Sequence, residues 1–175
     1  MKNVFLQGSH HIFRWEKLGN LETGRENLGP DMPVLVYRLL EYSMNHVLSE
    51  EYGVERANEL FRMVGHLAGG EFAKNVLDLT KAPDAFISEL QAKLKELRIG
   101  ILRLEEFSDS GDITLTVAED LDCSGLPPTG EVVCNYDEGF LAGVLDAYTG
   151  KTYHVREVDC WASGERFCRF KCQVL

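Results

Sequence analysis

Residues 155–172 read VREVDCWASGERFCRFKC, and they have the pattern of two short strands joined by a turn. The first strand comes from KTYHVREVD (151–159) and the second from ERFCRFKCQV (165–174), with CWASG between them. Runs that alternate apolar and polar residues on either side of a glycine-containing turn are typical of a β-hairpin. The sequence therefore predicts that the chain ends in a hairpin whose strands carry several cysteines.

Cys134, Glu157, Cys160 and Cys168 are the candidate metal ligands in this part of the chain. Cys160 and Cys168 flank the turn, and Cys134 precedes a helix that leads back to the same hairpin. Thiolates and carboxylates are both zinc ligands, and structural zinc sites are usually tetrahedral. On a regular strand, residues three apart point to opposite faces, so Glu157 and Cys160 can share a site only if the chain bulges or turns near Asp159.

The same stretch offers competing donors and a competing interpretation. Asp159 and His154 are ligand types, and Cys172 lies on the same strand face as Cys168, so each could replace one of the four. Without a metal, the cysteines would be buried free thiols that behave as small hydrophobic side chains. The spacing alone leaves zinc and free thiols equally open. The five cysteines cannot all pair within one chain, which argues against a disulfide framework.

Composition and charge exclude several classes of function. The 175 residues fit one domain (1–175) with an irregular N-terminal segment over 1–30. The net charge of −10 argues against nucleic acid and anionic membranes as partners, because no basic excess can neutralise phosphates. No apolar run has the length of a membrane span, and the N-terminus lacks the pattern of a signal peptide. A reducing, cytoplasmic location is therefore expected, in which cysteines are more often metal ligands or free thiols.

His10 and His11 are adjacent at the start of the chain, and neighbouring residues on a strand point apart. They are therefore expected at the surface or in a tail and not as a metal pair.

Four segments have helical periodicity. Pro33 and Pro83 each mark a helix start, and Gly53 and Gly150 each mark an end. The predicted helices run from about 33 to 52, from 54 to about 72, from 83 to about 97, and from about 136 to 149. Two of them contain glycines. Gly139 and Gly143 allow close approach of another backbone, whereas Gly65, Gly69 and Gly70 indicate close helix packing, a kink or room beside a ligand, of which packing is favoured.

ILRLEEF (101–107) and DITLTVA (112–118) form a second predicted hairpin, joined by the turn residues SDSGD. In DITLTVA, apolar and threonine residues alternate, which is the pattern of a strand with one buried face. The order of elements is three helices, a hairpin, a helix and a hairpin. It predicts an α+β fold in which helices pack on one side of an antiparallel sheet.

A single motif runs through the C-terminal third: Cys134, Glu157, Cys160, Trp161, Gly164, Cys168 and Phe170. This motif resembles the 4-vinyl-reductase-type small-molecule-binding domain, which is the sensor region of phenol- and xylene-responsive bacterial activators. In those sensors the cysteines and the glutamate bind zinc, so the resemblance implies a structural zinc ion held by Cys134, Glu157, Cys160 and Cys168. It also implies a fold related to transport-particle subunits and to haem-based nitric-oxide sensor domains, and a homodimer formed through the helices.

The resemblance has two departures. The phenol sensors hold the ligand hydroxyl with a His and a Trp upstream of the first zinc cysteine. This chain has no His between His66 and His154 and no Trp between Trp15 and Trp161. The ATPase and DNA-binding domains of those activators have no counterpart here either. Phenol itself is therefore not the expected ligand, and any output would pass through a regulatory protein partner or a dimer contact.

The leading hypothesis is a zinc-containing regulatory or sensor domain that binds a hydrophobic small molecule in an internal pocket. Such pockets are mostly apolar with a few orienting polar groups, for which Tyr136, Tyr148, Tyr153 and His154 are candidates. One alternative is a reductase or accessory enzyme of tetrapyrrole-type chemistry. It is less favoured because no glycine-rich dinucleotide fingerprint follows a strand. The others are a thiol redox switch, with Cys123 and Cys172 as free partners, and a structural adaptor.

Overall fold

The structure is a computed structural model that describes residues 13–175. The chain divides into two compact units, Met1–Asp31 and Met32–Leu175. In the first unit, the described residues form one turn of 3-10 helix, η2 (Trp15–Leu18), and one turn of α-helix, α1 (Leu21–Gly24). His10 and His11, for which a surface position is predicted, lie outside the described residues.

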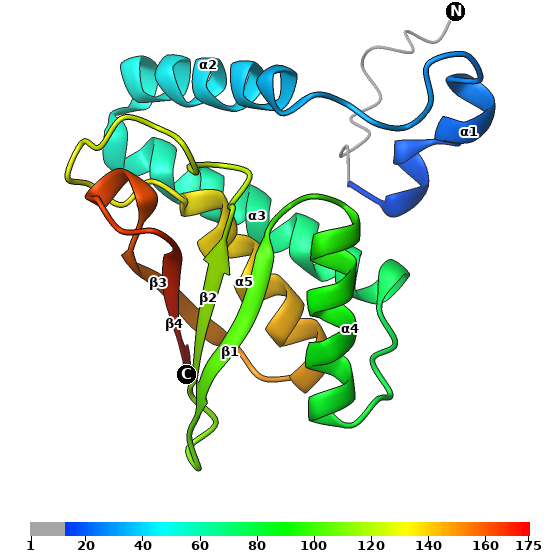
Figure 1. The fold of residues 1–175 in the computed structure, drawn as a ribbon, viewed down its shortest axis with the longest axis vertical. Helices are drawn as coiled ribbons and strands as arrows, with labels where there is room; N and C mark the ends of the chain where they lie inside the picture. The colour runs from blue at the N-terminus through cyan, green and yellow to red at the C-terminus, as the bar shows by residue number, and fades with distance from the viewer. Residues whose placement is uncertain (1–12) are drawn as a thin grey trace, which may run out of the picture. The chain divides into compact units, whose positions relative to one another are not determined.

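The second unit contains one sheet of four antiparallel strands in the order β1-β2-β4-β3 (Figure 1). Both predicted hairpins are present. The strands are β1 (Ile101–Phe107), β2 (Ile113–Ala118), β3 (Tyr153–Asp159) and β4 (Cys168–Val174). The two hairpins join through β2 and β4, where Leu115 lies opposite Phe170. Buried and more exposed residues alternate along β3 and β4, so one face of the sheet is covered. In β2, for which alternation is predicted, the apolar positions are buried as expected, but Thr116 is buried as well.

Four long helices complete the second unit and match the four predicted segments, except that the second continues to Val76, beyond its predicted end near 72. They are α2 (Val34–Tyr52), α3 (Val54–Val76), α4 (Pro83–Glu96) and α5 (Asn135–Thr149). Gly53 separates α2 from α3 with a φ of 85°, a backbone conformation that glycine adopts without strain. The fold is thus α+β, with helices beside an antiparallel sheet, as predicted.

Helices α3 and α5 contact each other through their backbones. A Cβ atom built on Gly69 would lie 2.0 Å from the carbonyl oxygen of Phe140. One built on Gly143 would lie 2.1 Å from the carbonyl oxygen of His66. Real Cβ atoms do not approach this closely, so the crossing requires glycine, which confirms the predicted close packing. Four glycines form the contact: Gly65, Gly69, Gly139 and Gly143.

The core lies between α4, α5 and the covered face of the sheet. Phe86 on α4 stacks on Tyr148 of α5 with ring centroids 3.7 Å apart, which adds aromatic contact energy to the burial of apolar area. α5 is buried along almost its whole first two-thirds, because α3 contacts it on one side and β3 on another. The largest fully buried apolar side chains include Phe86, Leu90, Leu115, Val144, Leu145 and Phe170.

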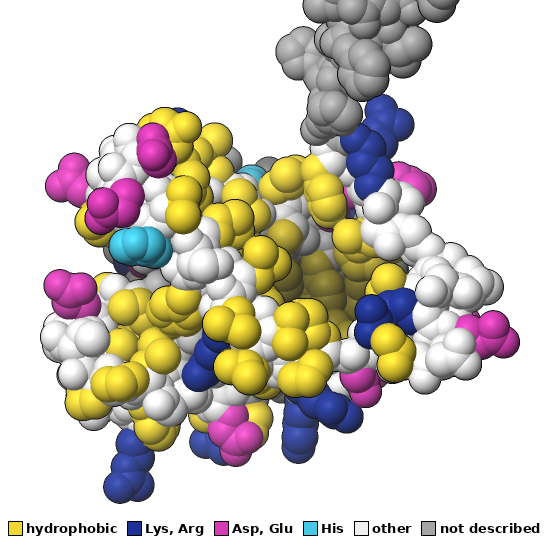
Figure 2. Space-filling view, turned by 90° about the horizontal axis from the view of Figure 1, so that it is seen from above, with side chains coloured by type: hydrophobic (Ala, Val, Ile, Leu, Met, Phe, Trp, Pro, Cys, Tyr) yellow, Lys and Arg dark blue, Asp and Glu magenta, His cyan; other side chains and the backbone are white. Residues whose placement is uncertain are grey.

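Helix α2 differs from the other long helices because none of its residues is buried. Its apolar side chains, which periodicity alone would place in a core, are exposed: Val34, Leu35, Val36, Leu39, Leu40, Met44 and Val47. Figure 2 views the molecule from the side on which α2 lies in Figure 1, and it shows hydrophobic side chains gathered on this side. None of the helices in residues 13–175 combines the length and apolar character needed to cross a membrane.

Candidate metal centre and ligand pocket

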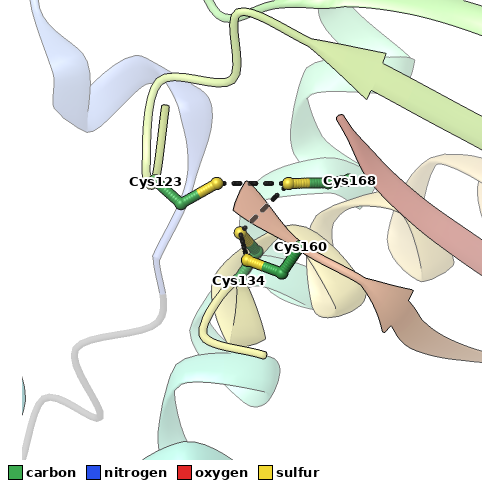
Figure 3. A group of neighbouring side chains, drawn as sticks. All are labelled: Cys123, Cys134, Cys160 and Cys168. Carbon is green, nitrogen blue, oxygen red and sulfur yellow. Dashed lines mark hydrogen bonds between the residues drawn. The ribbon is translucent and has the colours of Figure 1, made fainter. Parts of the chain in front are cut away.

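Four cysteine side chains meet near the N-terminal end of α5. Cys134 is the residue before α5, Cys160 follows β3, Cys168 begins β4, and Cys123 lies in the loop after β2. Figure 3 shows their thiols facing one another, and the four sulfur atoms all lie within 4.8 Å of one another. All four side chains are buried, and none is in a disulfide. Three of the four predicted ligands are therefore brought together, with Cys123 as an addition.

Two of the sulfur–sulfur distances match a tetrahedral metal site. The Sγ atom of Cys134 lies 3.8 Å from that of Cys160 and 3.7 Å from that of Cys168. In a regular tetrahedron with metal–sulfur bonds of about 2.3 Å, two sulfurs are separated by about 3.8 Å. The Sγ atoms of Cys123 and Cys168 lie 3.1 Å apart, so Cys123 also reaches the cluster. The residues present therefore fit a soft divalent cation such as zinc.

The cluster also favours ionisation of one thiol. The pKa of Cys160 is lowered because the thiols of Cys123, Cys134 and Cys168 can donate hydrogen bonds to its sulfur. The pKa of Cys134 is raised, because its thiol is hydrogen-bonded with the thiols of Cys123, Cys160 and Cys168. A thiolate is the form that binds a metal, so the arrangement supplies one ligand already suited to that role.

Glu157 lies beside the cluster because β3 departs from regular strand geometry between Glu157 and Cys160. The register of β3 against β4 shifts between Glu157 and Asp159. This is the bulge that the shared site for Glu157 and Cys160 requires. The Oε2 atom of Glu157 accepts a hydrogen bond from the backbone N–H of Cys134 at 2.9 Å. Its Oε1 atom is buried without a hydrogen-bond partner among residues 13–175. Burial, together with the charge of Cys160, raises the pKa of Glu157 to about 8.

Glu138, in the first turn of α5, holds the strand that carries Glu157. Its Oε1 atom accepts a hydrogen bond from the backbone N–H of Glu157 at 2.8 Å. Its Oε2 atom pairs with the guanidinium groups of Arg62 and Arg156. Two arginines balance this buried carboxylate, so α3, α5 and β3 are tied together next to the thiols.

The other donors considered from the sequence lie outside the cluster. Asp159 pairs with Arg169 at 2.5 Å, and His154 accepts a hydrogen bond from Arg156 at 3.2 Å. Cys172 is buried two positions beyond Cys168 along the covered face of β4, after Phe170, and burial raises its pKa to about 12. Cys123 was missed as a cluster member because its loop has neither periodicity nor a spacing motif that would have identified it.

A group of buried and half-buried carboxyl groups lies between α2 and the thiols. The Tyr37 hydroxyl donates a hydrogen bond to Oδ1 of Asp122 at 2.8 Å. Burial, followed by the charge of Asp120, raises the pKa of Asp122 to about 7. Burial, followed by the charge of Asp122, raises the pKa of Glu41 to about 9. The pKa of Asp137 is also raised well above its ordinary value by burial and by Asp120. These acids are thus neutral or share protons over much of the physiological range.

An apolar pocket lies at the opposite end of α5. It has a volume of about 290 Å³ and is bordered by α4, α5 and the β1–β2 hairpin. The Tyr148 hydroxyl donates to the carbonyl oxygen of Lys81 at 2.9 Å, and the Tyr153 hydroxyl donates to that of Gly111 at 3.1 Å. Both rings therefore offer apolar faces to the pocket. Most of the lining is apolar: Phe86, Ile87, Leu104, Phe107, Ile113 and Leu145.

Other hollows have different linings. A broad, open depression of about 870 Å³ is bordered by Arg38, Trp161 and Arg166 together with acidic residues, although most of its exposed lining is apolar. A cavity of about 150 Å³ lies between α2 and α3, where Tyr136 borders it. Of the four residues considered as orienting groups, Tyr148 and Tyr153 border the apolar pocket. Tyr136 and His154 lie elsewhere.

Comparison with known proteins identifies the family. The family model of the V4R domain matches residues 113–173. Uncharacterized protein MJ1642 of Methanocaldococcus jannaschii is 31% identical over 150 residues, which cover 86% of this chain and 83% of that protein. Uncharacterized protein MJ0150 of the same organism is 23% identical over 159 residues, which cover 91% of this chain and 86% of that protein. The chain belongs to the V4R domain family.

Three solved structures have a similar fold. The phenol-responsive sensory domain of the transcription activator PoxR, solved with phenol, gives a TM-score of 0.62 at 18% identity over 84% of this chain and 78% of that domain. A vinyl-4-reductase family protein of Methanocaldococcus jannaschii gives a TM-score of 0.58 at 18% identity, over 89% of this chain and 88% of that protein. Trafficking protein particle complex subunit 3 of Naegleria fowleri, covalently bound to palmitic acid, gives a TM-score of 0.65 at 13% identity, over 81% of this chain and 95% of that protein. At these identities the similarity concerns the fold.

Proposed function

We propose that this chain is a small-molecule sensor domain whose ligand occupies the apolar pocket between α4, α5 and the β1–β2 hairpin. The observation that carries the proposal is the pocket itself, whose volume of about 290 Å³ and apolar lining suit a small hydrophobic molecule. Ligand sites are typically concave and mostly apolar, with volumes from about 300 Å³ upward. A structural adaptor would not need such a cavity. The similarity of fold to a phenol-responsive sensory domain supports the same function.

The chemistry of the lining narrows the ligand class. The hydroxyls of Tyr148 and Tyr153 are engaged with backbone carbonyl oxygens, so neither is available to hold a polar group of the ligand. The charged side chains of Asp84 and Lys151 border the pocket but are exposed to solvent. A compact apolar molecule with at most one polar end at the mouth therefore fits better than phenol held by its hydroxyl.

The sensor proposal is tested with a series of alkyl-substituted benzenes and phenols of increasing size, with protein melting temperature as the readout. A ligand at one hundred times its dissociation constant stabilises the folded state by about 2.7 kcal/mol. For a chain of this size that free energy corresponds to a rise of roughly 5–11 °C. A rise confined to members that fit the pocket would support the proposal. No rise with any member of the series would overturn it.

The second part of the proposal is a structural zinc ion at the cysteine cluster. Cys134, Cys160 and Cys168 supply three ligands, and the family resemblance gives Glu157 as the fourth. The support is the sulfur–sulfur separations near 3.8 Å and the unpartnered Oε1 atom of Glu157. Four protein ligands leave no open position for water, so the ion would stabilise the fold and would not activate a nucleophile. Elemental analysis of the purified protein should give about one zinc per chain.

The third part is a homodimer formed through α2. The support is its exposed apolar surface, which includes Leu35 at 68% and Leu40 at 64% exposure. Contiguous apolar surface of this kind marks interaction sites, and a second copy would cover it. Sedimentation should give the mass of a dimer, and Leu35→Glu should give that of a monomer. A monomeric wild-type protein would contradict this part and would leave a regulatory protein as the partner for α2. We also propose a cytoplasmic location, because cysteines there are more often metal ligands or free thiols than disulfides.

A further inference from the structure

We infer that Cys123 supplies the fourth ligand of the metal centre, which makes it a four-thiolate site with Glu157 as a neighbouring hydrogen-bond acceptor. This inference rests on the metal centre proposed above and changes its composition. The sequence motif contains Glu157 and not Cys123, so the two residues are rivals for one position. Three observations favour the cysteine.

The first observation is where the sulfur lies. The Cys123 side chain has no exposed surface, and its Sγ atom lies 3.1 Å from that of Cys168. It belongs to the group of four sulfurs that lie within 4.8 Å of one another, and Figure 3 shows it completing the cluster from the side opposite to β3 and β4. Four thiolates are a common complete ligand set for structural zinc.

The second observation is how firmly the loop that carries Cys123 is held. The Oδ1 atom of Asp120 accepts hydrogen bonds from the backbone N–H groups of Asp122 at 2.8 Å and of Cys123 at 3.3 Å. On α2, the Arg38 guanidinium donates to the carbonyl oxygens of Leu121 at 2.8 Å and Ser124 at 2.9 Å. The backbone on both sides of Cys123 is therefore fixed, which is what a ligand on a loop requires.

The third observation is the role that Glu157 already has. Its Oε2 atom accepts a hydrogen bond from the backbone N–H of Cys134 at 2.9 Å. A carboxylate in this position orients the ligand residue Cys134 without binding the metal itself, as partners around metal ligands commonly do. With four thiolates in place, the tetrahedron is complete and Glu157 keeps this hydrogen bond. Because Arg38 holds the Cys123 loop, the metal centre would also be connected to α2.

The direct test is X-ray absorption at the zinc edge on the full chain loaded with zinc. Four thiolates give only sulfur neighbours at about 2.3 Å, whereas three thiolates and Glu157 add an oxygen at about 2.0–2.2 Å. The expected result is four sulfurs and no such oxygen. This measurement uses the wild-type protein, so it does not depend on whether any variant folds.

Variants loaded with cobalt(II) give an independent readout, since the sulfur-to-cobalt absorption band grows with the number of thiolate ligands. Cys123→Ser should lower the band by about a quarter, because one of four thiolates is lost. Glu157→Gln should keep the band and weaken metal affinity by about 10- to 100-fold, as expected for a residue that orients a ligand. Cys172→Ser is the matched control, because it removes another buried thiol of the same sheet, and it should change neither.

The possible outcomes separate the two proposals. An oxygen neighbour at zinc together with an unchanged cobalt band in Cys123→Ser would overturn the four-thiolate site and leave the metal centre with Glu157 as its fourth ligand. A wild-type protein that binds neither zinc nor cobalt would overturn the metal centre and the role of Cys123 with it. Four sulfurs at zinc would establish Cys123 as a ligand.

Discussion

At its N-terminal end α5 begins beside four buried thiols, whereas at its C-terminal end it borders an apolar pocket. The first end is rich in donors: Cys134 precedes the helix, and Asp137 and Glu138 are buried in its first turn. The second end offers Leu145 and the ring of Tyr148, whose hydroxyl is turned away to a backbone carbonyl. Helix α5 therefore connects a rigid cluster of thiols at one end with an apolar pocket that can hold a small ligand at the other.

The difference shows how one fold can combine rigidity with binding. Buried polar groups must be satisfied, so each one restricts its neighbours, and a cluster of them permits a single arrangement. Apolar contacts are not directional, so the pocket can bind different ligands without a change in the side chains that line it. Between the two ends, α3 crosses α5 at the four glycines, which makes the helix a stiff connection. The predictions below act on this connection, then on each end separately.

The largest effect is expected at the glycine crossing. Gly69→Ala would place a Cβ atom 2.0 Å from the carbonyl oxygen of Phe140, so the two helices would have to separate. Overpacking usually costs about 1–3 kcal/mol, and a clash between two backbones should exceed about 3 kcal/mol. Gly70→Ala is the control, because its nearest contact is an ordinary 3.8 Å. It should be neutral or stabilising by up to about 1 kcal/mol. Urea unfolding measures both, and equal effects would show that the crossing is not tight.

The next effect concerns the thiol end alone. Cys168→Ser removes a thiol that contacts both Cys123 and Cys134, so zinc content should fall from about one ion per chain to well under half. Loss of a structural metal should cost at least about 3 kcal/mol, which lowers the melting temperature by roughly 6–12 °C. Cys172→Ser, on the same strand, should keep the metal. A Cys168→Ser protein with full zinc content and unchanged melting temperature would contradict the metal centre.

Substitutions at the pocket end should change stability less than those at the thiol end, but they should specifically change ligand binding. Ile87 on α4 borders the pocket and is only partly buried, so its size can be changed without disturbing the core. Ile87→Trp should fill the space and weaken binding of the best alkylbenzene at least about tenfold, which is about 1.4 kcal/mol. Ile87→Ala should shift preference toward larger members of the series. Calorimetric titration measures both, and equal affinities in the two variants would place the ligand elsewhere.

The smallest effect is expected from the carboxyl groups between α2 and the thiols. Burial and Asp122 raise the pKa of Glu41 to about 9 from its ordinary 4.5, so the folded protein binds a proton that the unfolded chain has lost. This contribution to stability is complete below about pH 4.5 and is lost as the pH rises towards 9. Glu41→Gln removes it, so the fall in unfolding free energy between pH 6 and pH 9 should be smaller in the variant. Because Glu41 is only partly buried, solvent screens its interactions, and the difference over this whole range should stay below about 1 kcal/mol. Urea unfolding at several pH values, with zinc kept saturating, would detect it, and parallel curves would contradict it.

Local structure was largely predictable because it depends on neighbouring residues. Pro33, Pro83, Gly53 and Gly150 set helix ends, and alternation set the four strands. Glu157 and Cys160 required a bulge, and β3 contains one between Glu157 and Asp159. The glycines of α3 and α5 predicted close packing, although not that the two helices would meet each other.

The sequence by itself therefore determined the helices, the two hairpins and three of the thiols at the centre, because each follows from spacing along a short stretch of chain. Only the tertiary structure decided that β2 pairs with β4 and that Cys123 reaches Cys168 across 45 positions. It also decided that the apolar stripe of α2 stays exposed. Such contacts depend on how loops and layers close in space, and no local periodicity records them.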